Sequence, residues 1–526
     1  MNVRPWPGRT RVVVVGNGMA GFRFVQELTA LDRERRFAVT VVGDEPGAAY
    51  NRVLLSNVLA GKVAHDDVFL AHEGWYAQHA VTLIAGHQVT TLDRDRRQVR
   101  LDDARMVPYD LLVLATGSDA VVPPINGLAG RDGRPVRGIT TFRTLADCAR
   151  IAREATPNTK VVVVGAGVLG LEAARGLAGR GTDVTLVTRN GRLMERQLDA
   201  AASGHLRRAA AALGVRTARA GLTRVVAPAG EVRAVGLEDG TAIAADLVVL
   251  CCGVAPRIGL ARAAGLPVER GVLVDDSLRS PADGRVFAIG ECCEHRGRTY
   301  GLVAPVWEQA RIAARTVAAQ EAAPTYQGSP EVTRLKAAGI ELVCLGDSVA
   351  ARPDVDGGEG GYDGAGDDVV QVVTFEDSAQ GVYQKLVITG DRLTGAIVLG
   401  DTRSAGTLTQ LFDRQSILPP DRASLLITRR NAAVTVAQSP TLLPGRATIC
   451  QCNGVTKAAI CAAWGAGARL VSDVAKSTRA TTGCGTCRDT VEGLLEWLAT
   501  ADGGATAETG ITDHATIAEL PEEIPA

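Results

Sequence analysis

The 526-residue sequence lacks a long hydrophobic run and an excess of charge of either sign. No stretch approaches the roughly 18 apolar residues that a membrane-spanning helix needs, and the N-terminal MNVRPWPGRT has no apolar signal-peptide core. Lys and Arg number 57 against 58 Asp and Glu, a net charge of -1 that offers no basic surface to nucleic acid or anionic membranes. We therefore expect a cytoplasmic protein whose partners are small molecules or proteins, with no nucleic acid and no membrane.

Aromatic residues are also scarce, at 4% of the chain, whereas glycines number 59. This composition is expected where many tight turns bring the backbone close to a ligand. The 11 cysteines are an odd number in a long chain, and disulfide frameworks belong mainly to short secreted domains. We therefore expect reduced thiols, some of which serve as ligands.

A β-branched run followed by a glycine-rich turn and a helix-period stretch occurs twice in the first half of the chain. The glycines have the same spacing in both copies: Gly16, Gly18 and Gly21 in VGNGMAG, and Gly165, Gly167 and Gly170 in VGAGVLG. In a dinucleotide-binding fold the first glycine makes the tight turn, the second lets the backbone approach a pyrophosphate, and the third lets helix and strand pack closely. We therefore predict two Rossmann-like domains in an α/β fold.

The residues that follow the next strand differ between the two copies. The first copy places Asp44 and Glu45 where a ribose hydroxyl needs an acceptor, whereas the second offers Thr188 and Arg189 and no carboxylate. An arginine there can bind a 2′-phosphate, but it can equally be a solvated residue at a strand end, so the choice between NADH and NADPH stays open. Glu172, just inside the second helix, can face a cofactor or simply complement the helix dipole.

Four cysteines are concentrated in two short stretches near the end of the sequence. A C-x-C motif and, after 31 intervening residues, a C-x-x-C motif supply four thiolates: Cys450, Cys452, Cys484 and Cys487. Four thiolates complete a 2Fe-2S cluster or a tetrahedral zinc site, and the tight C-x-C spacing favours the cluster. Cys461 and the neighbouring pairs at 251–252 and 292–293 are interpreted as small buried side chains.

Five motifs in a fixed order carry a family resemblance over residues 10–320: VGNGMAG, YNRVLLS, LATGS, VGAGVLGLE and AIGE. They resemble the flavoproteins with two dinucleotide-binding domains, which include the pyridine-nucleotide disulfide reductases and the rubredoxin and ferredoxin reductases. The resemblance implies FAD in the first domain and NAD(P)H in the second. It also implies the residues that hold FAD: Gly16, Gly18, Gly21, Asp44, Glu45, Arg52, Val89, Thr116, Gly117, Gly290 and Glu291.

This sequence departs from that family at three places. Glu291 stands where the family commonly has Asp, and Asn57 stands where the ferredoxin-reductase branch often has a flavin-facing Lys, so Asn57 is given no role. No cysteine precedes Cys148, so the redox-active pair of the disulfide reductases is missing and dithiol chemistry is not expected. We name no catalytic acid or base, because hydride chemistry belongs to the cofactors. We expect Glu172 and Glu308 to lie near the flavin and nicotinamide, and the second fingerprint and Arg189 to contact the nucleotide.

The cysteine module resembles the 2Fe-2S domain of the bacterioferritin-associated ferredoxins. The order of all parts resembles the N-terminal half of the NAD(P)H nitrite reductase large subunits and the electron-transfer subunits of assimilatory nitrate reductases. We expect an FAD-binding domain from 1–120 and 244–322, an NAD(P)H-binding domain from 121–243, a small α+β domain from 323–441, a small helical 2Fe-2S domain from 446–500 and an acidic tail from 501–526. A Gly- and Asp-rich segment at 354–368 is expected to be a mobile surface loop.

The resemblance implies an electron path from NAD(P)H through FAD and the cluster to a separate nitrate or nitrite reductase catalytic subunit. The nitrite enzymes continue into a sirohaem half that this sequence lacks, so we expect no nitrite reduction by this chain alone. Two alternatives stay open. One is the flavin and 2Fe-2S subunit of an opine or amino-acid dehydrogenase complex, and the other is a redox sensor or scaffold with structural zinc.

Overall fold

The computed structural model describes residues 8–72, 74–128, 136–319, 324–335, 337–350, 370–427, 443–450, 453–482 and 487–505. The chain divides into two compact units, Met1–Ala432 and Ala433–Ala526, and each is described by itself. The segment expected to be a loop at 354–368 and most of the expected acidic tail lie outside the described residues.

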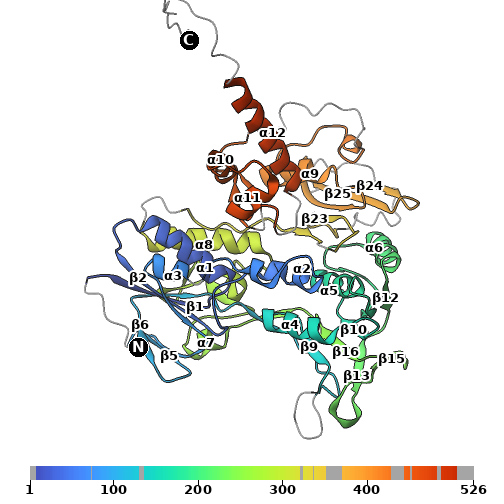
Figure 1. The fold of residues 1–526 in the computed structure, drawn as a ribbon, viewed down its shortest axis with the longest axis horizontal. Coiled ribbons are helices and arrows are strands. Elements are labelled where there is room, and N and C mark those ends of the chain that lie inside the picture. Colours follow the sequence, from blue (N-terminus) through green and yellow to red (C-terminus); the bar gives the residue numbers. More distant parts are fainter. Residues whose placement is uncertain are drawn as a thin grey trace, which may run out of the picture. The chain divides into compact units, whose positions relative to one another are not determined.

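The first sheet of the larger unit is a mostly parallel sheet with the strand order β19-β20-β7-β1-β2-β3. Its strands are β1 (Thr10–Val15), β2 (Phe37–Gly43), β3 (Thr82–Ala85), β7 (Leu111–Leu114), β19 (Arg279–Ser280) and β20 (Asp283–Ala288). The central strands are runs of β-branched and apolar residues because parallel sheets are covered on both faces. The helices α1 (Met19–Leu31) and α8 (Val303–Val317) lie side by side over this sheet (Figure 1).

The second sheet is built from the residues between the two parts of the first. Its order is β12-β11-β10-β16-β9, and every neighbouring pair is parallel. The strands are β9 (Ile139–Thr141), β10 (Lys160–Val164), β11 (Asp183–Val187), β12 (Val215–Ala218) and β16 (Leu247–Leu250). Its helices are α4 (Leu145–Glu154), α5 (Val168–Ala178) and α6 (Ala200–Ala212). A three-stranded sheet of β13 (Leu222–Val226), β14 (Ala234–Leu237) and β15 (Ala242–Ala244) follows β12.

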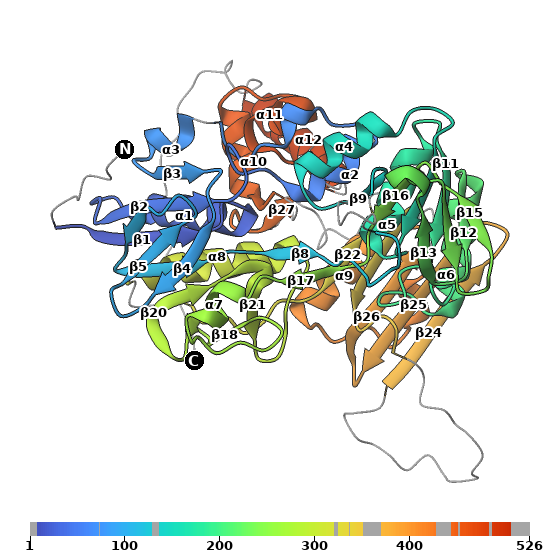
Figure 2. The ribbon, with the colours of Figure 1, turned by 90° about the horizontal axis from the view of Figure 1, so that it is seen from below.

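The part of the larger unit built on the first sheet is called the first half, and the part built on the second sheet is called the second half. Two short antiparallel strands carry the chain between these two halves. They are β8 (Ser118–Ala120), which follows the first sheet's β7, and β17 (Val254–Pro256), which follows the second sheet's β16 (Figure 2). Smaller elements complete the first half: β4 (Val89–Asp93), β5 (Gln98–Leu101), β6 (Met106–Pro108), β18 (Val272–Val274), β21 (Cys293–His295), α2 (Leu55–Leu59), α3 (Gly74–Gln78) and α7 (Gly259–Ala263).

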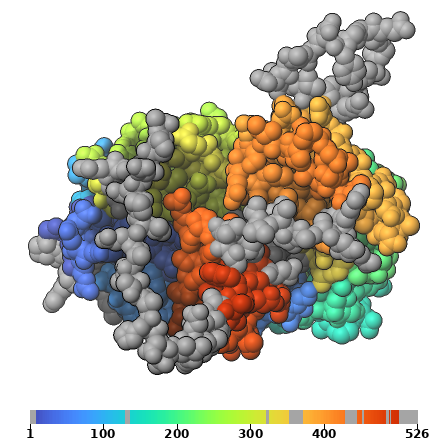
Figure 3. Space-filling view, turned by 90° about the horizontal axis from the view of Figure 1, so that it is seen from above, coloured from blue at the N-terminus to red at the C-terminus, as the bar shows by residue number. Residues whose placement is uncertain are grey.

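After α8, the described residues of the larger unit form a five-stranded antiparallel sheet with a helix, α9. They are β22 (Val332–Arg334), β23 (Leu342–Gly346), β24 (Val370–Asp377), β25 (Val382–Thr389), β26 (Arg392–Leu399) and α9 (Ala405–Arg414). Gly390, with φ +57°, forms the tight turn between β25 and β26. The sheet borders the second half on the molecular surface (Figure 3). Below that surface, the hydroxyl of the buried Tyr383 donates to Asp199 at 2.8 Å.

The smaller unit is a helical module with a short hairpin. Its elements are β27 (Thr448–Cys450), β28 (Val455–Thr456), α10 (Lys457–Gly465), α11 (Val471–Thr478) and α12 (Arg488–Ala505). Thr456 begins α10 as its N-cap, because its Oγ1 accepts from the Ala459 N–H. Ile460, Val474 and Leu494 form the fully buried centre where the three helices meet. The predicted α/β fold with two Rossmann-like domains, a small α+β domain and a helical module is confirmed. Among the described helices, none has both the length and the apolar character that a membrane span requires.

Candidate cofactor sites

In the first glycine fingerprint, Gly16 and Gly21 leave no room for a side chain. Gly16 has φ +117°, and a Cβ there would lie 2.1 Å from the Ala115 carbonyl oxygen at the end of β7. A Cβ at Gly21 would lie 2.0 Å from the Gly16 carbonyl oxygen, so α1 sits directly on the turn. Gly18, by contrast, has no atom within 4 Å of its missing Cβ. That open space at a helix N-terminus is what a pyrophosphate requires.

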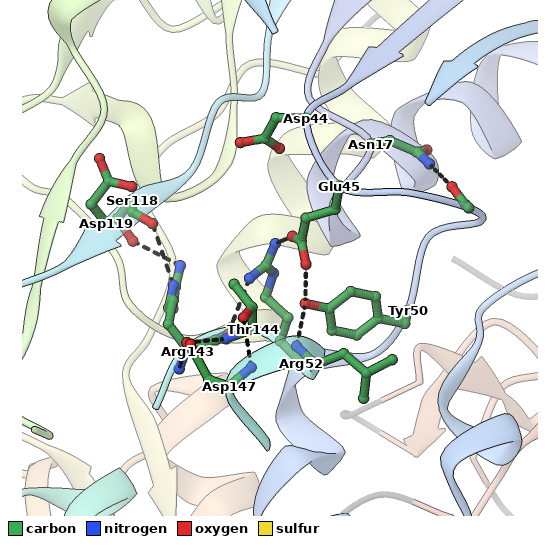
Figure 4. Close-up of polar contacts among 12 residues, drawn as sticks. Asn17, Asp44, Glu45, Tyr50, Arg52, Ser118, Asp119, Arg143, Thr144 and Asp147 are labelled. Carbon is green, nitrogen blue, oxygen red and sulfur yellow. Dashed lines mark hydrogen bonds and ion pairs between the residues drawn. The ribbon is translucent and has the colours of Figure 1, made fainter. Parts of the chain in front are cut away.

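Glu45, at the end of β2, is held by two partners beside this turn (Figure 4). It accepts a hydrogen bond from the Tyr50 hydroxyl at 2.7 Å and forms an ion pair with Arg52. Arg52 also donates to the carbonyl oxygen of Arg143 at 3.1 Å. Burial raises the pKa of Tyr50, whose hydroxyl therefore stays protonated and serves as a donor. Arg52 therefore links the end of β2 to the segment that precedes α4.

Asp44 lies on the other side of the strand end, and its partner is Arg257. The Arg257 guanidinium donates to Asp44 at 2.6 Å and to Asp119 at 2.5 Å, so it joins β2 to the β8 crossover. Thr116 donates through Oγ1 to the Arg257 carbonyl oxygen at 2.9 Å, and Gly117 has φ +68°. These contacts bring three of the predicted residues, Asp44, Thr116 and Gly117, together with Arg257, which no motif predicted.

Arg143 is a further residue beside the predicted site residues that the sequence motifs did not predict. It precedes α4 and forms an ion pair with Glu291, and it donates to Ser118 Oγ at 2.8 Å. Its backbone N–H donates to Asp147 Oδ2 at 3.0 Å, within the capping box that Asp147 and Thr144 form at the start of α4. The FRTLAD sequence could have predicted the capping box. No local pattern, however, indicates that Arg143 contacts Glu291, which is 148 positions away in the sequence.

Gly290 and its neighbours are closely packed between β20 and α8. Gly290 has φ +78°, and a Cβ there would lie 2.8 Å from the Cβ of Ala20 on α1. Its N–H donates to Gln309 Oε1 at 2.8 Å. Glu308, which is predicted near the flavin, accepts from Ser329 Oγ at 2.7 Å. Its buried neighbour Gln309 is therefore the α8 side chain that reaches the Gly290 turn, whereas Val89 lies buried in β4.

The second fingerprint repeats the backbone geometry of the first. Gly165 has φ +103°, and a Cβ there would lie 2.4 Å from the Cys251 carbonyl oxygen. A Cβ at Gly170 would lie 1.9 Å from the Gly165 carbonyl oxygen, whereas Gly167 has open space around its missing Cβ. Glu172 is buried in α5 and accepts from Ser56 Oγ of α2 at 2.7 Å. Its carboxylate therefore joins the two halves, and Arg189 is exposed beyond the end of β11.

The two vicinal cysteine pairs are poorly suited to thiolate chemistry. Cys251 and Cys252 follow β16 at the place that Ala115 and Thr116 take after β7, directly against the first glycine of each fingerprint. Burial raises the pKa of both thiols, and it raises the pKa of Cys292 and Cys293 as well. A thiol held in its neutral form is a weak nucleophile, so a packing role fits both pairs.

Two of the four predicted cluster ligands are described in the smaller unit. Cys450 ends β27 and Cys487 immediately precedes α12, and both are buried in the same apolar core. Asn453 Nδ2 donates to the Arg479 carbonyl oxygen at 2.7 Å and lies 3.8 Å from Cys450 Sγ. This amide joins the segment of the first cysteine pair to the segment that leads to the second. Cys452 and Cys484 lie outside the described residues. Buried sulfur with a nearby N–H donor fits an iron-sulfur cluster.

Family models match three successive parts of the chain. Residues 10–322 match the pyridine nucleotide-disulphide oxidoreductases, residues 332–416 match the rubredoxin NAD+ reductase C-terminal domain, and residues 448–497 match the BFD-like [2Fe-2S] binding domain. The predicted cofactors are confirmed by these matches: FAD, NAD(P)H and a 2Fe-2S cluster.

Individual relatives extend this result to nearly the whole chain. The assimilatory nitrate reductase electron transfer subunit of Bacillus subtilis is 34% identical over 97% of this chain and 64% of its own length. The nitrite reductase [NAD(P)H] of the same organism is 34% identical over 99% of this chain and 62% of its own length. This chain thus spans less than two thirds of either relative.

Among solved structures, putidaredoxin reductase in its covalent complex with putidaredoxin has a TM-score of 0.69 at 26% identity. The match covers 79% of this chain and 98% of that one. A ferredoxin reductase from Rhodopseudomonas palustris has a TM-score of 0.67 at 24% identity, over 78% of this chain and 96% of that one. With more than half of its length matched by the family model, the chain belongs to the pyridine nucleotide-disulphide oxidoreductases and is an NAD(P)H-dependent oxidoreductase.

Proposed function

We propose that this chain is an electron-transfer subunit that takes electrons from NAD(P)H and delivers them to a separate nitrate reductase catalytic subunit or, as second choice, a nitrite reductase catalytic subunit. One observation carries the proposal. Two complete dinucleotide cradles and a cysteine-bearing helical module occur in a single chain, and 97% of that chain aligns with the nitrate reductase electron transfer subunit of Bacillus subtilis. A location in the cytoplasm belongs to the same proposal, because the described cysteines are free thiols.

The first cradle is proposed to hold FAD through the residues predicted from the motifs, together with Arg143 and Gln309. The open space at Gly18 admits a pyrophosphate, and the Arg52 guanidinium supplies positive charge beside it. The pairing of Glu291 with Arg143 and Ser118 holds a carboxylate in a fixed orientation where β20 ends. Residues 1–120 and 244–322 are proposed as this domain, because strands from both parts share the first sheet.

The second cradle is proposed to hold NAD(P)H through Gly165, Gly167, Gly170 and Arg189, within residues 121–243. Bound FAD would supply the change from two-electron to one-electron chemistry, which the protein alone cannot perform. The protein's part is to orient the nucleotide, and Glu172 contributes by linking α5 to α2 of the other half. Residues 323–441 and 446–500 are proposed as the remaining domains. In the latter, Cys450, Cys452, Cys484 and Cys487 would hold the cluster, and Asn453 fixes the first of them.

The test is an anaerobic titration of the purified holoprotein with NADH and with NADPH, followed by absorbance across the flavin and iron-sulfur bands. We expect a nucleotide to bleach both bands, and equal amounts of iron and sulfide on analysis. Dithionite serves as the reference that reduces every centre. If dithionite reduces the protein and neither nucleotide does, the proposed direction is wrong and a substrate-oxidising dehydrogenase subunit replaces it. Zinc without sulfide would contradict the cluster.

A further inference from the structure

The strand that follows the second fingerprint ends with side chains suited to an anion. Thr188 is buried, and its Oγ1 donates to the Arg192 carbonyl oxygen at 3.1 Å, so it is turned into the loop. Arg189 comes next and is exposed. In Rossmann-type sites this strand end meets the adenosine ribose, where a carboxylate accepts from a 2′-hydroxyl and an arginine binds a 2′-phosphate. A carboxylate is missing from this strand end, and an arginine is present.

A second arginine reaches the same loop from the neighbouring strand. β11 and β12 are parallel, with Val187 opposite Ala218, so the residues that follow them emerge at one edge of the sheet (Figure 2). Arg219 is the first residue after β12. Gly191 has φ +75°, and a Cβ there would lie 2.4 Å from Arg219 Nε. The Arg219 side chain therefore lies against the loop that contains Arg189.

The positive charge of these two arginines is not neutralised locally. In the part of the chain that the structure describes, neither Arg189 nor Arg219 forms an ion pair. The acidic side chain of the same loop, Glu195, is engaged by the Asn190 amide. Arg216, which lies within β12, differs from Arg189 and Arg219 because it forms an ion pair with Asp183 at the opposite end of β11. These two uncompensated cations thus lie at the edge where the ribose is expected.

We propose that the second cradle selects NADPH over NADH, with Arg189 and Arg219 binding the 2′-phosphate. Guanidinium groups bind phosphate through paired, charge-assisted hydrogen bonds, whereas a 2′-hydroxyl offers neither the charge nor the acceptor oxygens. The inference rests on the proposed function, in which this cradle receives the reducing nucleotide. It adds the identity of that nucleotide.

Two measurements on the FAD-loaded protein test the inference. Stopped-flow reduction of the flavin gives the rate and apparent Kd for each nucleotide, and calorimetry gives the affinity for adenosine 2′,5′-bisphosphate and for AMP without any turnover. We expect NADPH to be preferred by about tenfold or more, and the bisphosphate to bind more tightly than AMP. In Arg189→Ala/Arg219→Ala the NADPH and bisphosphate affinities should fall about 10- to 100-fold, while those for NADH and AMP stay unchanged.

Arg216→Ala is the matched control, because it removes an arginine from β12 without touching the proposed phosphate site. It should leave the NADPH preference unchanged. A native protein that uses NADH as well as or better than NADPH would overturn the inference but leave the proposed function intact. Equal loss of both nucleotides in the double variant, at unchanged FAD content, would also overturn it. Failure of both nucleotides to reduce the flavin would contradict the proposed function itself.

Discussion

The two dinucleotide cradles have the same backbone and different strand ends. In both, the first glycine has a strongly positive φ, at +117° for Gly16 and +103° for Gly165, and its missing Cβ faces a carbonyl oxygen of a neighbouring strand. In both, the second glycine has open space. The backbone turn therefore provides for a pyrophosphate in either half, whatever the rest of the ligand is.

The difference between the cradles lies in the side chains that follow the next strand. In the first, Glu45 is bonded to Tyr50 and Arg52. In the second, Arg189 and Arg219 stand without a carboxylate partner among the residues described. A shared turn with different edge residues lets one protein hold two dinucleotides at separate sites. The turn binds the pyrophosphate that both dinucleotides contain, and the edge residues contact the groups in which they differ.

The largest effect should come from the glycine that makes the turn. Gly16→Ala forces an L-residue into φ +117° and places its Cβ 2.1 Å from a backbone oxygen that cannot move away easily. We expect a loss of about 3 kcal/mol or more in the free energy of unfolding, and mostly insoluble protein. Gly86→Ala is the control, since Gly86 has φ +74° and open space. It should cost only about 1 kcal/mol. Urea unfolding measures both, and equal losses would contradict the steric argument.

A smaller effect is expected at the arginine beside the first turn. Arg52→Ala removes the cation that pairs with Glu45 and leaves that carboxylate facing an anionic ligand. FAD affinity should fall about 10- to 100-fold, measured by fluorescence titration of the apoprotein. Tyr50→Phe keeps the ion pair and removes only the hydroxyl, so its effect should be clearly smaller. An Arg52→Ala protein that binds FAD normally would remove Arg52 from the site.

The next effect is on the pH dependence of stability, and it concerns an ion pair in the first half. Asp110, before β7, accepts from the Arg11 guanidinium at 2.7 and 3.0 Å, and mainly this contact holds its pKa below the usual value. A lowered folded-state pKa stabilises the protein above the unfolded pKa of about 3.9, and the benefit is lost as the pH falls through the folded pKa.

Asp110→Asn should therefore cost about 0.5–1 kcal/mol at neutral pH, a value reduced for the partial exposure of the pair, and progressively less as the pH falls below about 3.9. Asp246, before β16, accepts from the Lys160 N–H at 3.0 Å and serves as the comparison. Asp246→Asn makes the same change of carboxylate to amide at the equivalent position of the second half. Thermal unfolding across this range measures both variants, and a pH-independent cost at Asp110 would refute the ion-pair explanation.

The smallest effect is expected from making the cysteine pair of the second half resemble its counterpart in the first. Cys251→Ala/Cys252→Thr installs the Ala-Thr pair found at 115–116. Because burial raises the pKa of both thiols, we expect no redox role. Reduction of the flavin by nucleotide should change by less than about twofold. A loss of reduction in a variant with full FAD content would show that the thiols take part.

The sequence predicts the cradles well because each is a local pattern. A strand, three glycines at fixed spacing and a helix are contiguous, and nothing distant is needed to recognise them. The same holds for the cysteine motifs. Contacts made when the chain returns to an earlier sheet are different. Arg143 and Arg257 meet Glu291 and Asp44 only after the chain has passed between the two halves.

Glu308 and Gln309 illustrate a second limit. Glu308 on α8 is predicted to lie near the flavin, and this stays a prediction. The helix turns Gln309 inward toward Gly290, whereas Glu308 reaches Ser329 in a segment that follows the helix. One residue is 100° of rotation on a helix, so the choice between neighbours depends on packing that the apolar pattern of α8 resolves only roughly.

The most direct test of the shared cradle compares Gly18→Ala with Gly167→Ala. Both glycines have open space, so neither variant should unfold, and each should lose only the ligand of its own half. FAD content per chain and anaerobic flavin reduction by NADPH would be measured on both proteins. We expect Gly18→Ala to be isolated largely without FAD, and Gly167→Ala to keep FAD that NADPH no longer reduces. FAD retained in Gly18→Ala, or normal reduction in Gly167→Ala, would contradict the assignment of the two cradles.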